Sequence, residues 1–118
     1  MDFEELRDYC LRKQGVNESF PFDEETLVFK VCSKMFCLIN SKPPFSINLK
    51  CDPEKAIELR EEYEEIIPGY HMSKKHWNTV DIEGDLSDKF LQELLDNSYN
   101  LVVEKLTKKE KKSIGIDN

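Results

Sequence analysis

Three short stretches between residues 26 and 51 are rich in apolar residues, and the last of them alternates most clearly between apolar and polar positions, which is typical of β-strands. The stretches Thr26–Val31 and Lys34–Ile39 are separated only by Cys32-Ser33, which predicts a tight antiparallel hairpin. The third stretch is predicted to start only after Pro43-Pro44, because proline lacks the N–H that a central strand needs. That third stretch, Phe45–Cys51, is predicted to turn Phe45, Ile47, Leu49 and Cys51 inward, and Ser46, Asn48 and Lys50 outward.

Helical spacing of apolar residues predicts three helices. The first covers about residues 2–14 and is capped by Asp2. The second starts with Asp52 as its N-cap and is ended by Pro68-Gly69, and the third covers about residues 87–106. Their inward-facing residues are Phe3, Leu6, Tyr9 and Cys10, then Ala56, Leu59, Tyr63 and Ile66, then Phe90, Leu91, Leu94, Leu95, Val102 and Leu106.

Two shorter strands, about Tyr70–Ser73 and Trp77–Ile82, complete the order α-β-β-β-α-β-β-α. Hairpin-linked strands with segregated helices predict the α+β class, a two-layer domain whose antiparallel sheet has its helices mainly on one face. The other face is then expected to be free. We predict a single domain over residues 1–109, followed by a polar, flexible tail over residues 110–118.

Charge is unevenly distributed in this acidic chain of 118 residues, whose net charge is −7. Residues 1–66 carry 9 basic and 15 acidic side chains, and residues 81–104 carry 1 and 7. Residues 67–80 carry 2 basic side chains and no acidic one, and residues 105–118 carry 5 and 2. A nucleic-acid backbone is therefore expected to approach only a local basic patch.

The chain has no apolar run long enough for a membrane span and no basic, apolar start typical of a signal peptide. We therefore predict a cytoplasmic protein without membrane contact. Cys10, Cys32, Cys37 and Cys51 form no CxxC motif and lie among apolar residues. They are predicted to be reduced thiols, since disulfides are rare in the cytoplasm.

Residues 67–80 form the most informative segment, because they contain His71, His76, Trp77 and the pair Lys74-Lys75. Cationic and neutral donors beside an indole suit a surface that contacts an anion or a flat ring. Two interpretations stay open for Trp77. Its ring either packs in the core, with the lysines as solvated turn residues, or stacks on a nucleic-acid base.

Several segments together carry a resemblance to a known family: Phe20-Pro21-Phe22, Val28-Phe29-Lys30-Val31, Lys34-Met35-Phe36, Ile47 to Glu54, Pro68 to Met72, Lys75-His76-Trp77-Asn78-Thr79 and Ser98-Tyr99-Xaa-Leu101-Val102. Over residues 1 to about 109 the chain closely resembles the MmcQ/YjbR family of small bacterial proteins. This resemblance implies a compact fold called CyaY-like or secretion-chaperone-like. It also implies DNA binding, because family members are commonly named DNA-binding proteins after a proposed double-wing arrangement.

The resulting expectation is a small, non-enzymatic domain that binds DNA, or alternatively a protein-interaction or chaperone-like module that holds a peptide on its free sheet face or edge. No catalytic motif is present. No cofactor is expected, and a zinc site built from Cys32, Cys37, His71 and His76 is disfavoured by its spacing. The candidate nucleic-acid-binding residues are Lys30, Lys34, Lys50, Tyr70, His71, Lys74, Lys75, His76, Trp77 and Asn78.

Overall fold

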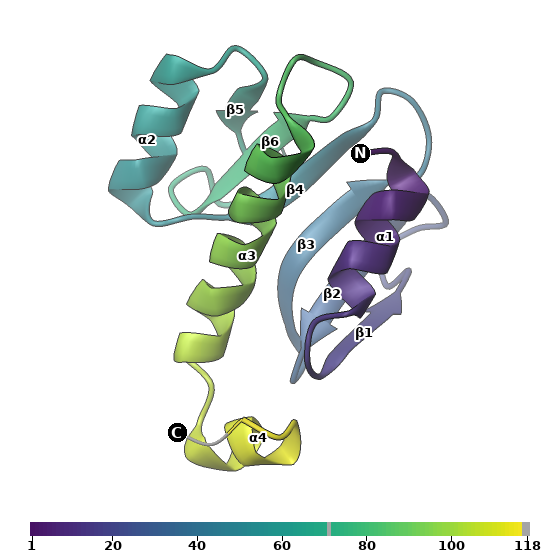
Figure 1. The fold of residues 1–118 in the computed structure, drawn as a ribbon, viewed down its shortest axis with the longest axis vertical. Helices are drawn as coiled ribbons and strands as arrows, with labels where there is room; N and C mark the ends of the chain where they lie inside the picture. Colours follow the sequence, from purple (N-terminus) through teal and green to yellow (C-terminus); the bar gives the residue numbers. More distant parts are fainter. Residues whose placement is uncertain (71, 117–118) are drawn as a thin grey trace.

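A computed structural model of the chain describes residues 1–70 and 72–116. The helices and strands lie in two layers (Figure 1). Their order is α1 (Phe3–Leu11), β1 (Val16–Ser19), β2 (Thr26–Val31), β3 (Lys34–Asn40), β4 (Ser46–Lys50), α2 (Pro53–Glu62), β5 (Ile66–Pro68), β6 (Trp77–Asp81), α3 (Asp88–Glu104) and α4 (Lys108–Ser113).

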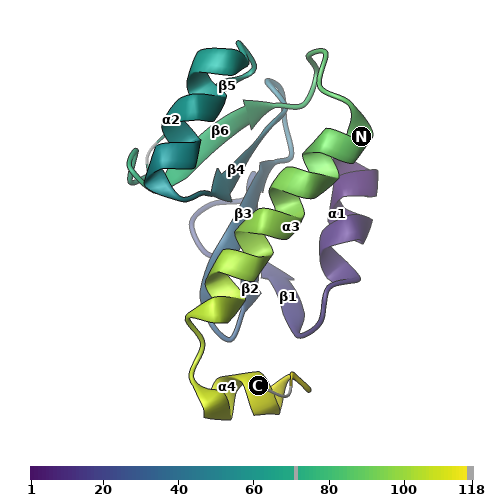
Figure 2. The ribbon, with the colours of Figure 1, turned by 60° about the vertical axis from the view of Figure 1, so that its left-hand side comes forward.

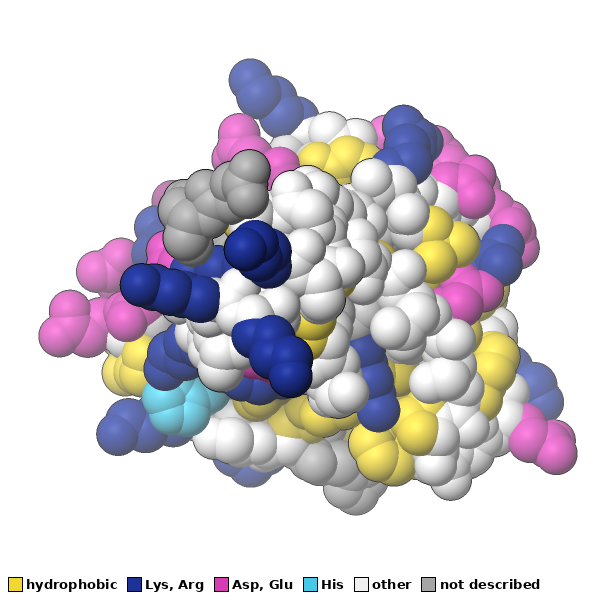
Figure 3. All heavy atoms as spheres, turned by 90° about the horizontal axis from the view of Figure 1, so that it is seen from below, with side chains coloured by type: hydrophobic (Ala, Val, Ile, Leu, Met, Phe, Trp, Pro, Cys, Tyr) yellow, Lys and Arg dark blue, Asp and Glu magenta, His cyan; other side chains and the backbone are white. Residues whose placement is uncertain are grey.

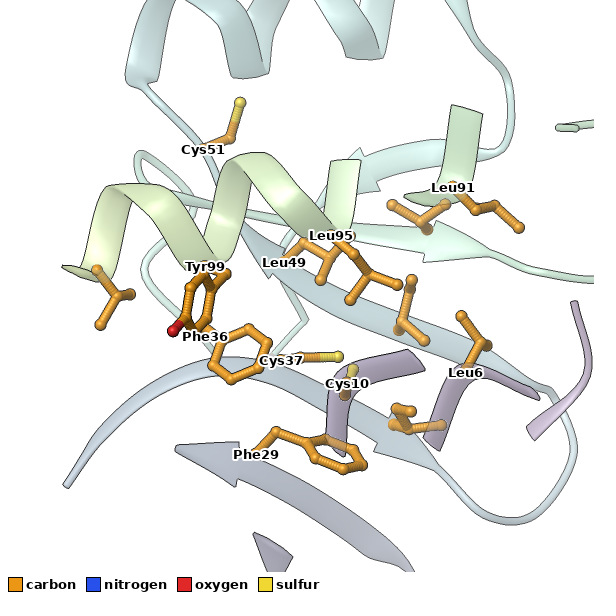
Figure 4. Close-up of a cluster of buried hydrophobic side chains, with 14 of the residues drawn as sticks. Leu6, Cys10, Phe29, Phe36, Cys37, Leu49, Cys51, Leu91, Leu95 and Tyr99 are labelled. Carbon is orange, nitrogen blue, oxygen red and sulfur yellow. The ribbon is translucent and has the colours of Figure 1, made fainter. Parts of the chain in front are cut away.

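All neighbouring strands pair antiparallel in one six-stranded sheet of order β1-β2-β3-β4-β6-β5. Helices α1, α2 and α3 pack against one face, and α3 crosses the middle of the sheet (Figure 2). The main core fills the space between the layers, where Phe36 meets Tyr99 edge to face, and Leu95, Leu91 and Leu6 continue the same cluster away from these two rings (Figure 4). The predicted α+β class with helices mainly on one face is confirmed.

Both edge strands differ from the sequence-based expectation. The strand β1 was not predicted, because Val16 is its single apolar residue; it is held by pairing with β2 and by the Arg7–Glu18 ion pair at 2.6 Å. The predicted second helix continued through Ile66, whereas α2 ends at Glu62 and Tyr63 is extended. The chain then forms β5, so the predicted strand around Tyr70 is wrong for the described residues 70, 72 and 73.

The C-terminal stretch predicted to be frayed contains the helix α4. Thr107 and Glu110 cap its start reciprocally, since each side chain accepts a hydrogen bond from the other residue's backbone N–H. Ile114, directly after this helix, lies against Gly15, where an added Cβ would approach its side chain to 2.6 Å. Gly15 has a φ of +75°, which glycine adopts without strain. These contacts place α4 beside the β2–β3 turn, where the Cys32 thiol lies 3.7 Å from the Glu110 carbonyl oxygen.

A serine hydroxyl from α3 joins two strands of the sheet where they separate. The fully buried Ser98 accepts a hydrogen bond from the Lys50 N–H at 2.9 Å and donates one to the Phe36 carbonyl at 2.5 Å. The register of β3 shifts at this place, since Phe29 pairs with Cys37 and Lys30 with Met35. Ser98 thus satisfies two backbone groups that the β3–β4 ladder leaves unpaired, and it fixes α3 to the sheet.

The face of the sheet that was predicted to be free is partly covered. Val28, Leu38 and Trp77 form a second apolar cluster there, with Met35 and Met72 packed against it. Asn48 was expected to point into solvent, but it is 9% exposed and accepts a hydrogen bond from the Thr79 hydroxyl at 2.5 Å. The expectation failed because the chain between β5 and β6 folds back over this face, where Thr79 also accepts a hydrogen bond from the Tyr70 N–H at 3.0 Å.

Candidate nucleic-acid interface

Arg60 on α2 holds the loop that leads into β6. Its guanidinium donates to the Asn78 side-chain oxygen at 2.6 Å, to the Trp77 carbonyl at 3.3 Å, and to the Lys74 carbonyl. The loop closes on itself through the Trp77 N–H, which donates to the Ser73 carbonyl at 3.0 Å. Arg60 was not predicted as part of this site, because the sequence around a single arginine on an acidic helix does not indicate the carbonyl groups that it contacts.

Two of the predicted binding residues serve the structure of this loop. Trp77 is 8% exposed, and its ring packs against Val28 and Leu38, which agrees with the core interpretation. Asn78 is 2% exposed and lies on the opposite face of β6, where it accepts from Arg60 and donates to the Ala56 carbonyl at 3.4 Å. Neither side chain can meet a nucleic acid unless the loop opens.

The other predicted residues of this segment lie at the surface. Lys75 and His76 are exposed, and Tyr70 is 66% exposed. Lys74 is exposed too, but its ammonium group donates to the Gly69 carbonyl at 3.1 Å, so it also shapes the loop. His71 lies outside the described residues.

Strand register brings the three predicted sheet lysines to the same end of the strands. Lys30 pairs with Met35 near the end of β2, and Lys34 begins β3 beside the turn. Lys50 ends β4 and pairs with Trp77, the first residue of β6. Since the strands are antiparallel, the end of β2, the start of β3, the end of β4 and the start of β6 coincide. The loop lysines therefore lie beside Lys50.

The helix α4 adds basic side chains that are not among the predicted binding residues. Lys34 faces Glu110, and the pKa of this carboxyl is lowered first by the hydrogen bond from the Thr107 N–H and further by the Lys34 ammonium group. Figure 3 looks onto this part of the molecule and shows lysine and arginine side chains gathered there, with acidic ones mainly toward the rim. We define the basic end as Lys30, Lys34, Lys50, Lys74, Lys75, Lys105, Lys108, Lys109, Lys111 and Lys112.

Acidic residues collect at the opposite end of the strands. This acidic end comprises residues 1–5, 23–25, 41–46 and 81–89, which hold ten acidic side chains against two lysines. Hydrogen bonds join these segments, since the Ile82 N–H donates to the Phe45 carbonyl and the Ser41 N–H to the Glu25 carbonyl. The acidic chain thus has a strongly segregated charge distribution, which its net charge conceals.

The four cysteines are free thiols. The sulfur atoms of Cys10 and Cys37 point toward one another in the core (Figure 4), and burial raises the pKa of the Cys37 thiol well above its ordinary value. Cys32 lies beside α4. Among residues 1–70 and 72–116, no three histidine, cysteine or acidic side chains are grouped so that they could hold a metal ion.

The family model YjbR matches residues 11–101 of this chain. The chain belongs to the YjbR family. The uncharacterized protein YjbR of Escherichia coli K12 is 32% identical over 115 residues, which cover 95% of this chain and 96% of that protein. The uncharacterized protein YbdF of Escherichia coli O157:H7 is 42% identical over 97 residues, covering 80% of this chain and 79% of YbdF.

Solved structures with the same fold are also similar to this chain. The crystal structure of the Deinococcus radiodurans protein DR2400, a DUF419 domain, has a TM-score of 0.87 at 45% identity and covers 96% of this chain and 87% of its own. The crystal structure of a Pseudomonas syringae protein has a TM-score of 0.75 at 28% identity, and the match covers 86% of this chain and 98% of that protein. The resemblance seen in the sequence is confirmed at the level of family and fold. The relatives named as uncharacterized establish no activity.

Within the described part of the chain, the helices are too short or too polar to cross a bilayer.

Proposed function

We propose that this member of the YjbR family is a non-enzymatic binding domain that holds nucleic acid by its phosphate backbone at the basic end. The observation that carries the proposal is the segregation of charge: ten of the 17 lysine and arginine residues lie along one end of the strands and on α4, although the net charge is −7. Clustered lysines bind phosphate as point charges and release the counterions condensed on the nucleic acid.

Contacts to phosphate, rather than to bases, are favoured by the position of the aromatic residues. Of the tyrosine and the tryptophan in residues 67–80, Trp77 is buried and Tyr70 alone is exposed, whereas the basic end offers ten lysines to phosphates. Base stacking requires accessible aromatic faces. The proposed site therefore distinguishes poorly between sequences, and it binds duplex DNA more tightly than a single strand because a duplex has the higher charge density.

The alternative, a peptide held on the free sheet face or along an edge, has less support. Trp77, Met72 and their apolar neighbours cover part of that face. The edge strand β5 has only three residues, the last of which is Pro68. A short edge that ends in proline is a poor template for another strand.

A fluorescence anisotropy titration with a labelled duplex and a labelled single strand, at several salt concentrations, tests the proposal. With about four lysine contacts, the logarithm of the affinity for duplex DNA falls with log salt at a slope of about −4. In Lys75→Ala/Lys109→Ala the slope is reduced by about two units, because each lysine accounts for about one. Both side chains are exposed, so the fold is expected to be preserved.

The matched control is Lys55→Ala/Lys89→Ala, which removes the same charge from exposed positions of α2 and α3. The control variant is expected to bind almost as tightly as the unchanged chain. Absence of duplex binding at low salt contradicts the proposed function. An equal loss in both double variants contradicts the location of the site, because it assigns the effect to overall charge.

A further inference from the structure

A groove of about 530 Å³ lies at the acidic end, on the side opposite the basic end. It is bounded by the start of α1, by the β3–β4 loop and by the loop between β6 and α3. Pockets of roughly this volume accommodate small ligands or a few side chains of a peptide. Neither the family resemblance nor the proposed phosphate contacts involve this groove.

Hydrogen bonds and an ion pair fix the walls of the groove. Glu83 accepts a hydrogen bond from the Phe45 N–H at 3.2 Å, and the Ile82 N–H donates to the Phe45 carbonyl at 3.3 Å. The N-terminal ammonium group of Met1 lies 2.6 Å from Asp88 and ties the start of α1 to the start of α3. The groove is thus formed by three segments that are already joined, so a ligand does not have to order them.

The lining combines an apolar surface with an acidic one. Met1, Phe3, Phe45 and Ile82 contribute partly buried apolar side chains. Asp2, Glu4 and Glu83 contribute carboxylates. Asp2 and Glu83 also accept backbone hydrogen bonds, from Glu5 and Phe45.

The charge around the groove determines which ligand it suits. The acidic end carries ten acidic side chains and two lysines, so its field repels anions and attracts cations. A simple cation would leave the apolar lining exposed to water, and a neutral apolar ligand would forgo the carboxylates. A ligand with both a cationic and an apolar group satisfies both parts of the lining.

We propose that this groove binds a cationic peptide segment that alternates lysine or arginine with apolar side chains. The apolar side chains contact Phe3, Phe45 and Ile82, and the cationic ones meet Glu4 and the carboxylates around it. The partner is a protein with an exposed basic, amphipathic segment. This inference is independent of the proposed nucleic-acid function, because it involves the opposite end of the strands.

The test uses a short, labelled, amidated peptide of alternating lysine and leucine, titrated with the full chain at low salt. Backbone amide shifts in the ¹⁵N-labelled protein are expected to change at residues 2–4, 41, 45 and 82–83. A peptide of alternating lysine and glycine is expected to bind more weakly by about tenfold, since it buries no apolar side chain. A peptide of alternating glutamate and leucine is expected not to bind.

Glu4→Lys is the informative variant, and Glu54→Lys is its matched control. Both glutamates are exposed in the first turn of a helix, so both substitutions change the charge and the helix terminus alike. Glu4→Lys is expected to weaken lysine–leucine peptide binding by about tenfold, because an attractive charge becomes repulsive. Glu54→Lys is expected to change it by less than about twofold.

Three results overturn the proposal: no saturable binding of the lysine–leucine peptide, shift changes that lie outside the groove, or equal effects of the two glutamate variants. The shift changes are measured on the unchanged chain, so they test the location of the peptide site even if a variant folds poorly.

Discussion

The two faces of the sheet are stabilised in different ways. On the face that carries α1, α2 and α3, a continuous apolar core includes the fully buried Phe36, Ile47 and Leu95. On the other face, a small cluster around Val28, Leu38 and Trp77 is covered by a loop instead of by helices. The position of that loop depends on a few polar contacts, which makes it the more easily displaced part of the molecule.

This difference bears on function, because the loop brings Lys74, Lys75 and His76 to the basic end. The loop is anchored by Arg60, which is half-buried, and by Trp77, which is buried. A substitution at an anchor is therefore expected to alter binding although neither anchor is one of the ten lysines of the basic end. The following variants separate the contributions of the two faces.

The largest expected effect comes from the same truncation made once on each face. Leu95→Ala removes a fully buried side chain from the main core and is expected to lower the free energy of unfolding by about 4 kcal/mol. Leu38→Ala, in the smaller cluster, is expected to cost about 2 kcal/mol, since the loop can move or water can enter. Urea denaturation measures both, and an equal or larger loss in Leu38→Ala contradicts the comparison.

Removing the loop anchor is expected to have the next largest effect. Arg60→Ala leaves the buried Asn78 and two carbonyl groups without their charged donor and is expected to cost about 2 kcal/mol. Trypsin is then expected to cleave faster after Lys74 or Lys75, which mass spectrometry of the fragments detects. Arg12→Ala, which removes an exposed arginine at the end of α1, is the control and should leave this cleavage unchanged.

Ser98→Ala tests the bond between α3 and the sheet. The Lys50 N–H and the Phe36 carbonyl lose their common partner, so the free energy of unfolding is expected to fall by about 1.5 kcal/mol. Asn97→Ala, at the exposed neighbouring position, is expected to change it by less than about 0.5 kcal/mol. Indistinguishable denaturation curves for the two variants would show that these backbone groups find other partners.

The smallest expected effect is the modification of the Cys32 thiol, which lies at the border of the main core. Cys32 is half-buried beside α4, whereas Cys10, Cys37 and Cys51 are buried. A thiol reagent is expected to react with Cys32 first, while burial and the raised pKa of Cys37 keep that thiol unreactive in the native chain. In denaturant without reductant, all four cysteines should react; recovery of two or fewer would reveal a disulfide.

Alternation and helical spacing predicted the central elements, because β2, β3, β4 and α3 each have a periodic apolar face. The edge strands were not predicted. The strand β1 has a single apolar residue. The apolar residue Ile66 of β5 continues the helical spacing of α2, so it was assigned to the predicted second helix. The helix α4 could have been predicted from Thr107 and Glu110, which have the spacing of a capping box.

The candidate site was only partly predictable. Alternation placed Lys30 and Lys50 on the outward face of their strands, and register then brings them to the same end of the sheet. The position of α4 depends on Gly15 and Cys32, which lie far from it in sequence, so no local pattern indicates it. The burial of Trp77 likewise depends on Val28 and Leu38, two residues of other strands.

The segregation of charge also gives the molecule a large electric dipole moment. Five-residue strands such as β4 separate the two ends by about 17 Å, which exceeds the screening length of about 8 Å in physiological salt. A polyanion at close range therefore exerts a torque that turns the lysines toward it, while the net charge of −7 resists its approach. Salt weakens the torque and the repulsion together, and their effects on the association rate oppose each other. The salt dependence of nucleic-acid affinity is thus expected to lie mainly in the dissociation rate.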